Sequence, residues 1–185
     1  MKKVLLLLLA MALAGSAQAV EVAGIDLPDD AEVAGEELQL NGYGIRKKFV
    51  FVKVYIGSLY TSAPASTLED VLELPGPKLI RMDFLYNKVD REKIVDAFAE
   101  GFEKNSPQLV ATPAARAFLG LFRNDFVADD RVDLILKTDG AVSAIHNGET
   151  LGTVDSAELV EGVLRIYLGE QPADAAMKAG MLGKK

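Results

Sequence analysis

The stretch from Asn41 to Tyr60, NGYGIRKKFVFVKVYIGSLY, holds the side chains best suited to bind a small molecule. Arg46 offers a planar cationic fork that can hold a carboxylate through two parallel hydrogen bonds. Aromatic and aliphatic residues follow at once, and such side chains suit the apolar part of a ligand. Together these residues predict a site for a small amphipathic anion, with Arg46 at its mouth.

The predicted ligand contacts come from this stretch and from two later segments. They are Arg46, Phe49, Phe51, Lys53 and Tyr55 in the stretch, and Phe98, Phe118 and Phe122 further along the chain. The last three could instead fill the core, which is the commoner place for such side chains. Arg46 could likewise be structural, in an ion pair with Glu36, Glu37 or Asp83 at the sheet margin.

Several kinds of catalytic chemistry are excluded by composition. The chain contains no cysteine, so thiol catalysis and thiolate metal sites are impossible. His146 is the only histidine and stands beside Asn147-Gly148, where we expect an exposed turn residue. A zinc site or a Ser-His-Asp arrangement would depend on that one imidazole. We therefore predict no cofactor and no metal, and we favour ligand binding over catalysis.

The first residues have the pattern of an export signal. Lys2 and Lys3 precede an apolar run, and Ala17-Gln18-Ala19 fits the small-x-small pattern of a cleavage site. We expect a signal peptide over residues 1–19 and one domain over residues 20–185, located in the periplasm or secreted. No later window approaches the roughly 20 apolar residues that a membrane span requires, so none is expected after leader removal.

The charge balance bears on partners. Loss of two lysines with the leader would lower the formal net charge from −7 to −9. The basic residues form no stripe, which predicts that nucleic acid is not a partner and makes an anionic membrane surface unattractive as well. The expected partner is a small hydrophobic or amphipathic ligand. The sequence does not define the oligomeric state.

Hydrophobic periodicity predicts the elements that position the site. From Phe49 to Tyr60 both faces of a period-2 pattern are largely apolar, which predicts a central strand entered through a corner at Gly42-Tyr43-Gly44. Asp155 is expected to cap a helix that ends at Gly169, and Pro172 to begin the last helix. Other strands are predicted at 25–27, 37–40, 78–85, 131–137, 141–145 and 150–154, and other helices at 68–74, 91–105 and 114–125. This order of elements predicts an α+β fold with a mostly antiparallel sheet and helices gathered on one face.

Five segments, taken in order, resemble the bacterial exported members of the chalcone isomerase-like family. They are LNGYGIRKKF, KVYIGSLY, the strand after Pro77 with the helix ending in FEKN, HNGETLG, and LGEQPADAAMKAGMLG. The resemblance extends from about Val20 to Gly183. It implies an open-faced β-sandwich, in which a large antiparallel sheet carries helices on one face and a ligand cleft lies between the two layers.

The resemblance also implies two possible functions. Plant enzymes of the family cyclise chalcones, while relatives without that activity bind fatty acids, some through an Arg paired with a Tyr. The Arg of the family matches Arg46, but the enzymes' Thr, Tyr and Asn fall on Val54, near Asp90 and near Ala97. One polar group of four is retained. This favours binding of a fatty-acid-like carboxylate that is anchored by Arg46. The alternative is an isomerase of the intramolecular lyase type, which would act on an enone or chalcone-like molecule with Arg46 as electrophile.

Overall fold

A seven-stranded antiparallel sheet forms the centre of the protein in a computed structural model that describes residues 19–49 and 51–184. The strand order is β11-β10-β9-β6-β5-β4-β3. The strands are β3 (Asp30–Val33), β4 (Glu36–Lys48), β5 (Val52–Thr61), β6 (Lys78–Phe84), β9 (Arg131–Leu136), β10 (Ala141–His146) and β11 (Glu149–Asp155). The predicted signal peptide falls on residues that, apart from Ala19, lie outside the described part of the chain.

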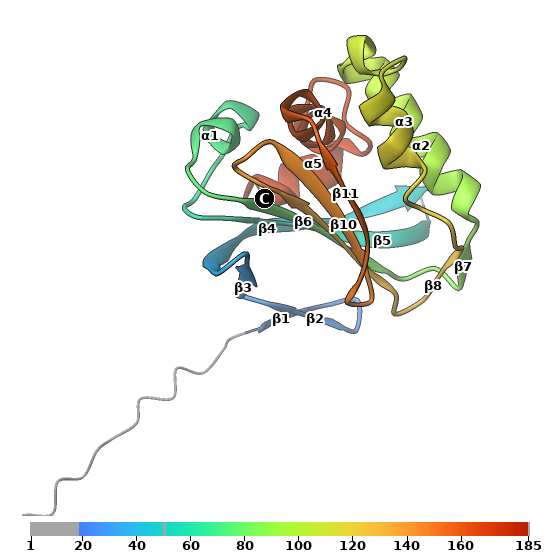
Figure 1. The fold of residues 1–185 in the computed structure, drawn as a ribbon. Coiled ribbons are helices and arrows are strands. Elements are labelled where there is room, and N and C mark those ends of the chain that lie inside the picture. The colour runs from blue at the N-terminus through green and yellow to red at the C-terminus, as the bar shows by residue number, and fades with distance from the viewer. Residues whose placement is uncertain (1–18, 50, 185) are drawn as a thin grey trace, which may run out of the picture.

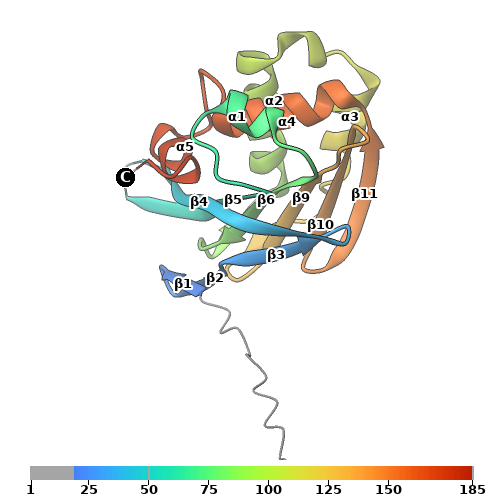
Figure 2. The same cartoon turned by 90° about the vertical axis from the view of Figure 1, so that its left-hand side faces the viewer.

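Helices cover one face of this curled sheet (Figures 1 and 2). They are α1 (Leu68–Glu73), α2 (Arg91–Asn105), α3 (Pro113–Leu119), α4 (Ala157–Leu168) and α5 (Ala175–Met181), with a short 3-10 helix, η1 (Pro107–Leu109), between α2 and α3. Two small ribbons pair β1 (Ala19–Val22) with β2 (Ile25–Pro28) and β7 (Lys88–Val89) with β8 (Phe126–Val127). The predicted α+β class is confirmed. Within the described residues, no helix combines the length and apolar character needed to cross a membrane.

Strand β6 shows how the sequence selects the face that the helices cover. Its alternate residues Ile80, Met82 and Phe84 are buried in the core beneath the helices, as the alternation predicted. Leu159 and Val163 of α4 belong to the same core. Removal of these apolar surfaces from water stabilises the contact between sheet and helices.

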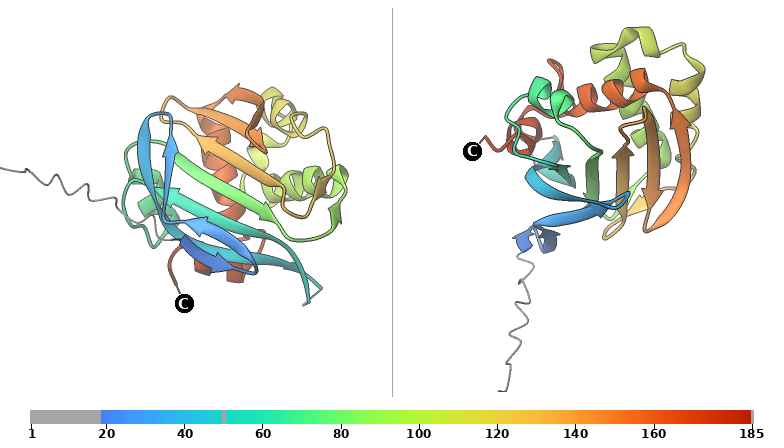
Figure 3. Two further views of the ribbon diagram at one scale, coloured as in Figure 1. Left: turned by 90° about the horizontal axis from the view of Figure 1, so that it is seen from below. Right: turned by 60° about the vertical axis from the view of Figure 1, so that its left-hand side comes forward.

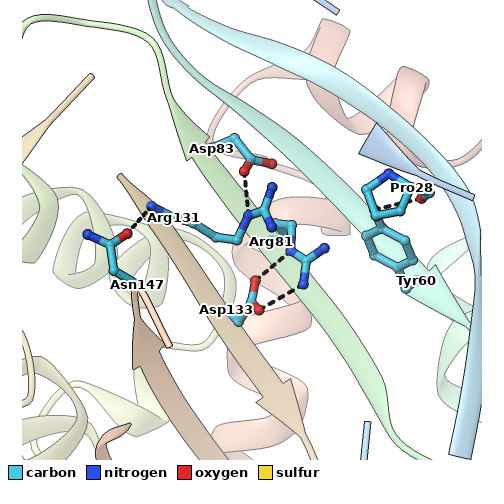
Figure 4. A network of polar contacts seen from close by, with 7 residues as sticks. All are labelled: Pro28, Tyr60, Arg81, Asp83, Arg131, Asp133 and Asn147. Atoms are coloured by element: carbon cyan, nitrogen blue, oxygen red, sulfur yellow. Dashed lines mark hydrogen bonds and ion pairs between the residues drawn. The ribbon is translucent and has the colours of Figure 1, made fainter. Parts of the chain in front are cut away.

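The helix-free face of β6 carries charged residues instead (Figure 4). Arg81 lies opposite Asp133 in the β6–β9 ladder and donates two hydrogen bonds to it, of 2.7 and 2.8 Å. Arg131 Nε donates to Asp83 Oδ1 at 2.7 Å, and these two residues are also a cross-strand pair. Opposite charges at directly facing positions stabilise an antiparallel sheet. Asp83 is therefore engaged on the face opposite to the helices.

The β4–β5 hairpin differs from the prediction that a strand begins at Phe49. Strand β4 continues to Lys48, and Phe49 and Phe51 lie in the turn that precedes β5. Phe49 has a φ of 49°, and the Phe51 N–H donates to the Phe49 carbonyl. Phe and Val favour strands, so the composition of the tip hid the turn. The predicted corner at Gly42-Tyr43-Gly44 is instead part of β4, between two irregularities in its pairing with β5.

Some helix ends differ from the predictions as well. Helix α3 ends at Leu119 rather than at residue 125. The N-cap of α4 is Ser156 and not Asp155, because the Ser156 hydroxyl accepts the first-turn N–H of the helix at 3.2 Å. Helix α5 begins after Asp174, whose side chain caps it, and not at Pro172. In each case the element exists as predicted and a neighbouring residue sets its end.

Helix α5 packs against the backbone of β4 and β5 because glycines leave room for it. A Cβ atom at Gly44 would lie 2.5 Å from the Met177 Cα, and one at Gly57 would lie 2.7 Å from the Met177 Sδ. A Cβ at Gly42 would collide with the carbonyl oxygen of Gly180. The corner glycines therefore permit a close approach of helix to strand, and this contact holds the hairpin that carries Arg46.

This packing predicts that alanine is more destabilising at Gly44 than at Gly57. Gly44→Ala should destabilise the fold by about 2–3 kcal/mol, because its Cβ meets helix backbone that cannot yield locally. Gly57→Ala should cost about 1 kcal/mol or less, since the end of the Met177 side chain can rotate away. Urea unfolding followed by circular dichroism measures both. Equal losses in the two variants would contradict the packing described for α5.

Candidate functional site

Arg46 and Tyr55 lie directly opposite each other in the β4–β5 ladder. Tyr55 belongs to the core beneath the helices, and Arg46 Nη1 lies 3.4 Å from the Tyr55 hydroxyl oxygen. The central carbon of the guanidinium is 5.8 Å from the centre of the Tyr55 ring. The strand register therefore places a phenol beside the cation, in both hydrogen-bonding and cation–π contact.

Tyr167 of α4 adds a second phenol to this place. Its ring is buried, and its hydroxyl donates to the Met82 Sδ at 3.2 Å. A thioether is a weak hydrogen-bond acceptor, so the Tyr167 hydroxyl can rotate and donate to a stronger acceptor when one is present. Burial raises the pKa of Tyr167 well above its ordinary value, and the hydroxyl therefore stays protonated as a donor. The Tyr55 phenol raises the pKa of Arg46, which stays cationic.

Arg46 makes no ion pair within residues 19–49 and 51–184. It takes part in none of the contacts within 4 Å that join charged groups there. Asp83 is paired with Arg131 on the other face of the sheet, and Glu36 and Glu37 stand at the opposite end of β4. The structural alternative for Arg46 is therefore contradicted. A half-buried charge without a partner is costly, and an anionic ligand would offset that cost.

A small closed cavity lies behind Arg46, between the sheet and helices α2 and α4. Its walls include Tyr55, Ile94, Phe98 and Tyr167, and its volume is about 10 Å³. That is room for one water molecule at most. The polar groups of Arg46 and the two phenols thus converge on a space that holds no acyl chain in this conformation.

An open groove of about 620 Å³ lies in front of Arg46. It is bounded by the β4–β5 hairpin, by the first turns of α2 and by the segment that precedes α2. This volume falls in the usual range of small-molecule sites. Arg46, Tyr55, Ile94 and Ala97 line both the groove and the closed cavity, so they form the wall between the two spaces.

The groove is basic, although the chain as a whole is acidic. Five cationic side chains line it, namely Arg46, Lys47, Lys48, Lys88 and Lys93, against three carboxylates from Asp90, Asp96 and Glu100. The formal net charge of the whole sequence is −7. A local excess of positive charge in a concave surface attracts anions to it. The arrangement thus suits a ligand with an anionic end.

Four of the predicted ligand contacts lie around this site. Arg46, Phe49 and Tyr55 line the groove, and Phe98 lines the closed cavity. Tyr55 supplies the phenol partner of Arg46 that the sequence did not assign, because the pairing depends on the exact register across the hairpin turn.

The other four predicted contacts lie elsewhere. Phe51 and Lys53 are exposed near the hairpin turn and line neither space. Phe118 and Phe122 are buried and pack around Phe98, with ring centroids 5.2 and 5.1 Å from the Phe98 ring. Their core role, which was the alternative in the sequence analysis, is the one that the structure shows.

Sequence reasoning did not single out Tyr167, which lies in the helix that was expected to end at Gly169. Its hydroxyl was the available signal, because the other large buried residues of that helix are aliphatic. Among the other tyrosines, Tyr86 lines the groove, whereas Tyr60 lies on the helix-free side and donates to the Pro28 carbonyl at 3.0 Å (Figure 4). The sequence could therefore predict that a tyrosine lies near Arg46, but not which tyrosine it is.

His146 is not the exposed turn residue that was predicted. It is the last residue of β10, is partly buried, and has its Nε2 3.2 Å from the Asp130 carboxylate. It lines neither the groove nor the closed cavity. Strand β10 extends one residue further than expected, to His146, so the imidazole belongs to the strand and not to the Asn147-Gly148 turn.

Comparisons with known proteins agree with this geometry. A family model described as chalcone isomerase-like matches residues 19–183. The chain belongs to the chalcone isomerase-like family. Fatty-acid-binding protein 1 of Arabidopsis thaliana is 24% identical over 170 residues, an alignment that covers 76% of this chain and 61% of that protein. The chain thus spans less than two thirds of the length of this relative.

A solved structure shows the same fold. The crystal structure of an Arabidopsis thaliana fatty-acid binding protein matches this member of the chalcone isomerase-like family with a TM-score of 0.70 and 19% sequence identity. The match covers 89% of this chain and 96% of that chain. The large sheet and its layer of helices are therefore shared over nearly the whole domain.

The groove coincides with the positions that the chalcone isomerase-like resemblance singled out. Val54, Asp90 and Ala97, where the enzymes' polar groups were expected to fall, all line it beside Arg46. Val54 and Ala97 carry no hydrogen-bonding side chain, and the Asp90 carboxylate lies 3.2 Å from the Lys88 ammonium. Of the four polar groups that the resemblance implies for the enzymes, the groove therefore contains only Arg46.

The buried phenol of Tyr167 predicts a specific dependence of stability on pH. Its pKa is raised in the folded state, so the unfolded chain loses this proton first as pH rises above about 10. Stability that is complete below that pH is therefore lost above it. Tyr167→Phe should flatten the decline of melting temperature between about pH 9 and pH 11. An unchanged decline in the variant would show that the phenol is not held neutral.

Proposed function

We propose that this protein binds a long-chain fatty acid or a similar amphipathic carboxylate, with the carboxylate on Arg46. One observation carries the proposal: a half-buried guanidinium that forms no ion pair among the described residues contacts the Tyr55 phenol at the inner end of a basic groove. An ionised carboxylate can accept two hydrogen bonds from the guanidinium. The Tyr55 hydroxyl, which also lines the groove, would donate to one of its remaining lone pairs.

The acyl chain would lie in the open groove, against an apolar strip between β5 and α2. Val52, Val54, Ile94 and Ala97 supply this strip, and the lysines of the rim can keep their ammonium groups in water. The closed cavity of about 10 Å³ is too small for a chain. The sequence comparison and the structural comparison both lead to an Arabidopsis fatty-acid-binding protein, which supports the same class of ligand.

An isomerase acting on an enone is not favoured. Such an enzyme stabilises an enolate through several donors placed around the developing charge. At the corresponding positions Val54 and Ala97 offer none, and Asp90 would repel the enolate. The Arabidopsis relative found by both comparisons is described as a fatty-acid-binding protein.

Calorimetric titration with hexadecanoate tests the anchor. Arg46→Ala should weaken binding by about 10- to 150-fold, the effect of losing a charged hydrogen-bonding partner worth about 1.5–3 kcal/mol. Arg46→Lys should recover only part of the loss, because an ammonium lacks the planar fork. Arg123→Ala, a change at an exposed arginine outside the groove, is the matched control and should bind like the wild type.

Hexadecanol provides a second control for the same titration. It has the same chain without the carboxylate, so the wild type should bind it much more weakly, and Arg46→Ala should bind acid and alcohol with similar affinity. If the wild type does not distinguish the acid from the alcohol, Arg46 is not the anchor.

We also propose that the chain is a bacterial exported member of the family, made with a leader over residues 1–19 and working as a single domain over residues 20–185. The support is the sequence pattern of the leader and the family match over residues 19–183. Intact mass measurement of the envelope fraction of an expressing bacterium should show a chain that begins at Val20. A full-length chain confined to the cytoplasm would refute export.

A further inference from the structure

The tip of the β4–β5 hairpin exposes two aromatic rings. Phe49 is 78% and Phe51 89% exposed, and no large apolar side chain of the described residues is more exposed than these two. Phe49 holds a left-handed backbone conformation that glycine or asparagine adopts more readily. The turn itself therefore gives no reason for aromatic residues here, and exposed apolar groups of this kind mark binding surfaces.

The tip projects from the rest of the sheet. Strand β6 pairs with β5 only from Tyr55 onward, so the last two rungs of the hairpin, Lys47 with Lys53 and Lys48 with Val52, have no neighbouring strand. Figure 3 (left) shows the hairpin reaching out from the body of the molecule. Its end can thus approach a flat surface before other parts of the protein do.

Lysines surround the exposed rings. Lys47, Lys48 and Lys53 are exposed, and none of them forms an ion pair within the part of the chain that the structure describes. Lys47 and Lys53 face each other across the ladder, an arrangement of like charges that destabilises a hairpin. An anionic surface in contact with the tip would offset this repulsion.

We propose that this hairpin tip, formed by residues 47–49 and 51–53, docks on the surface of an anionic phospholipid bilayer. Phe49 and Phe51 would enter the boundary between headgroups and acyl chains, while the lysines contact lipid phosphates. A protein partner is less well matched, since two rings are far smaller than the apolar centre of a stable protein interface. The negative net charge of the chain predicted that an anionic membrane would be unattractive, because a charge summed over the whole sequence does not show the local basic character of the tip.

The tip and the groove are continuous. Phe49 lines the mouth of the groove, and Arg46 lies three residues before it on β4. An amphipathic carboxylate that leaves the bilayer beside the tip would meet Arg46 without crossing open water. This role in ligand transfer rests on the proposed function, whereas docking itself does not.

Vesicle flotation of the mature protein tests the docking. Vesicles of phosphatidylcholine with about a third phosphatidylglycerol should carry the wild type, and pure phosphatidylcholine should not. Phe51→Ala should weaken binding about tenfold through loss of buried apolar surface, and Lys53→Glu at least tenfold through reversal of a charge. Raising the salt concentration should release the wild type, because screening removes the attraction of the lysines.

Matched controls separate the tip from the general surface. Val110→Ala and Arg123→Glu change an exposed apolar and an exposed basic residue elsewhere, and both should float like the wild type. Neither Phe51 nor Lys53 lines the groove, so hexadecanoate titration in solution should be unchanged in their variants. Failure of the wild type to float, or equal losses in the controls, would overturn the docking and leave the fatty-acid proposal standing. Loss of hexadecanoate binding in Arg46→Ala with normal flotation would separate the two sites.

Discussion

A guanidinium that forms no ion pair with any described carboxylate governs the arrangement around the groove. Arg46 is half-buried, and its direct partner is the phenol of Tyr55 on the facing strand. A phenol leaves the guanidinium its full charge, so the place stays attractive to an external anion.

The hairpin that carries Arg46 links the core to the outside of the molecule. Near its middle, Gly44 and Gly57 admit helix α5 and fix both strands. Towards its end, the register that pairs Arg46 with Tyr55 also brings the cation to the wall between a closed cavity and an open groove. Beyond that, the turn holds two exposed rings. The helix contact, the cation and the exposed rings thus follow one another along the two strands of this hairpin.

The sequence could predict the fold because the patterns that define it are local. Alternation in β6 identified the buried face, and the starts of α1 and α3 were predicted to within one residue. The hairpin turn between Lys48 and Val52 was missed because strand-forming residues occupy that stretch of the sequence. One hidden turn changed the expected exposure of Phe51 and Lys53.

The site was less predictable because it depends on contacts between distant segments. Arg46 was identified from its type and its surroundings in the sequence. Its partners were not, since Tyr55 depends on the register across the turn and Tyr167 comes from a helix more than a hundred residues later. Phe118 and Phe122 were candidates on composition alone, and only the structure shows that they pack edge to face in the core.

Carbon-13 NMR of carboxyl-labelled hexadecanoate bound to the mature protein tests the central claim most directly. A carboxylate held by Arg46 should titrate at a pKa below that of the free acid, because a neighbouring positive charge favours its ionised form. A bound carboxyl group that titrates above the free acid, as burial in an apolar pocket without a cation would cause, would contradict an ionic anchor at Arg46.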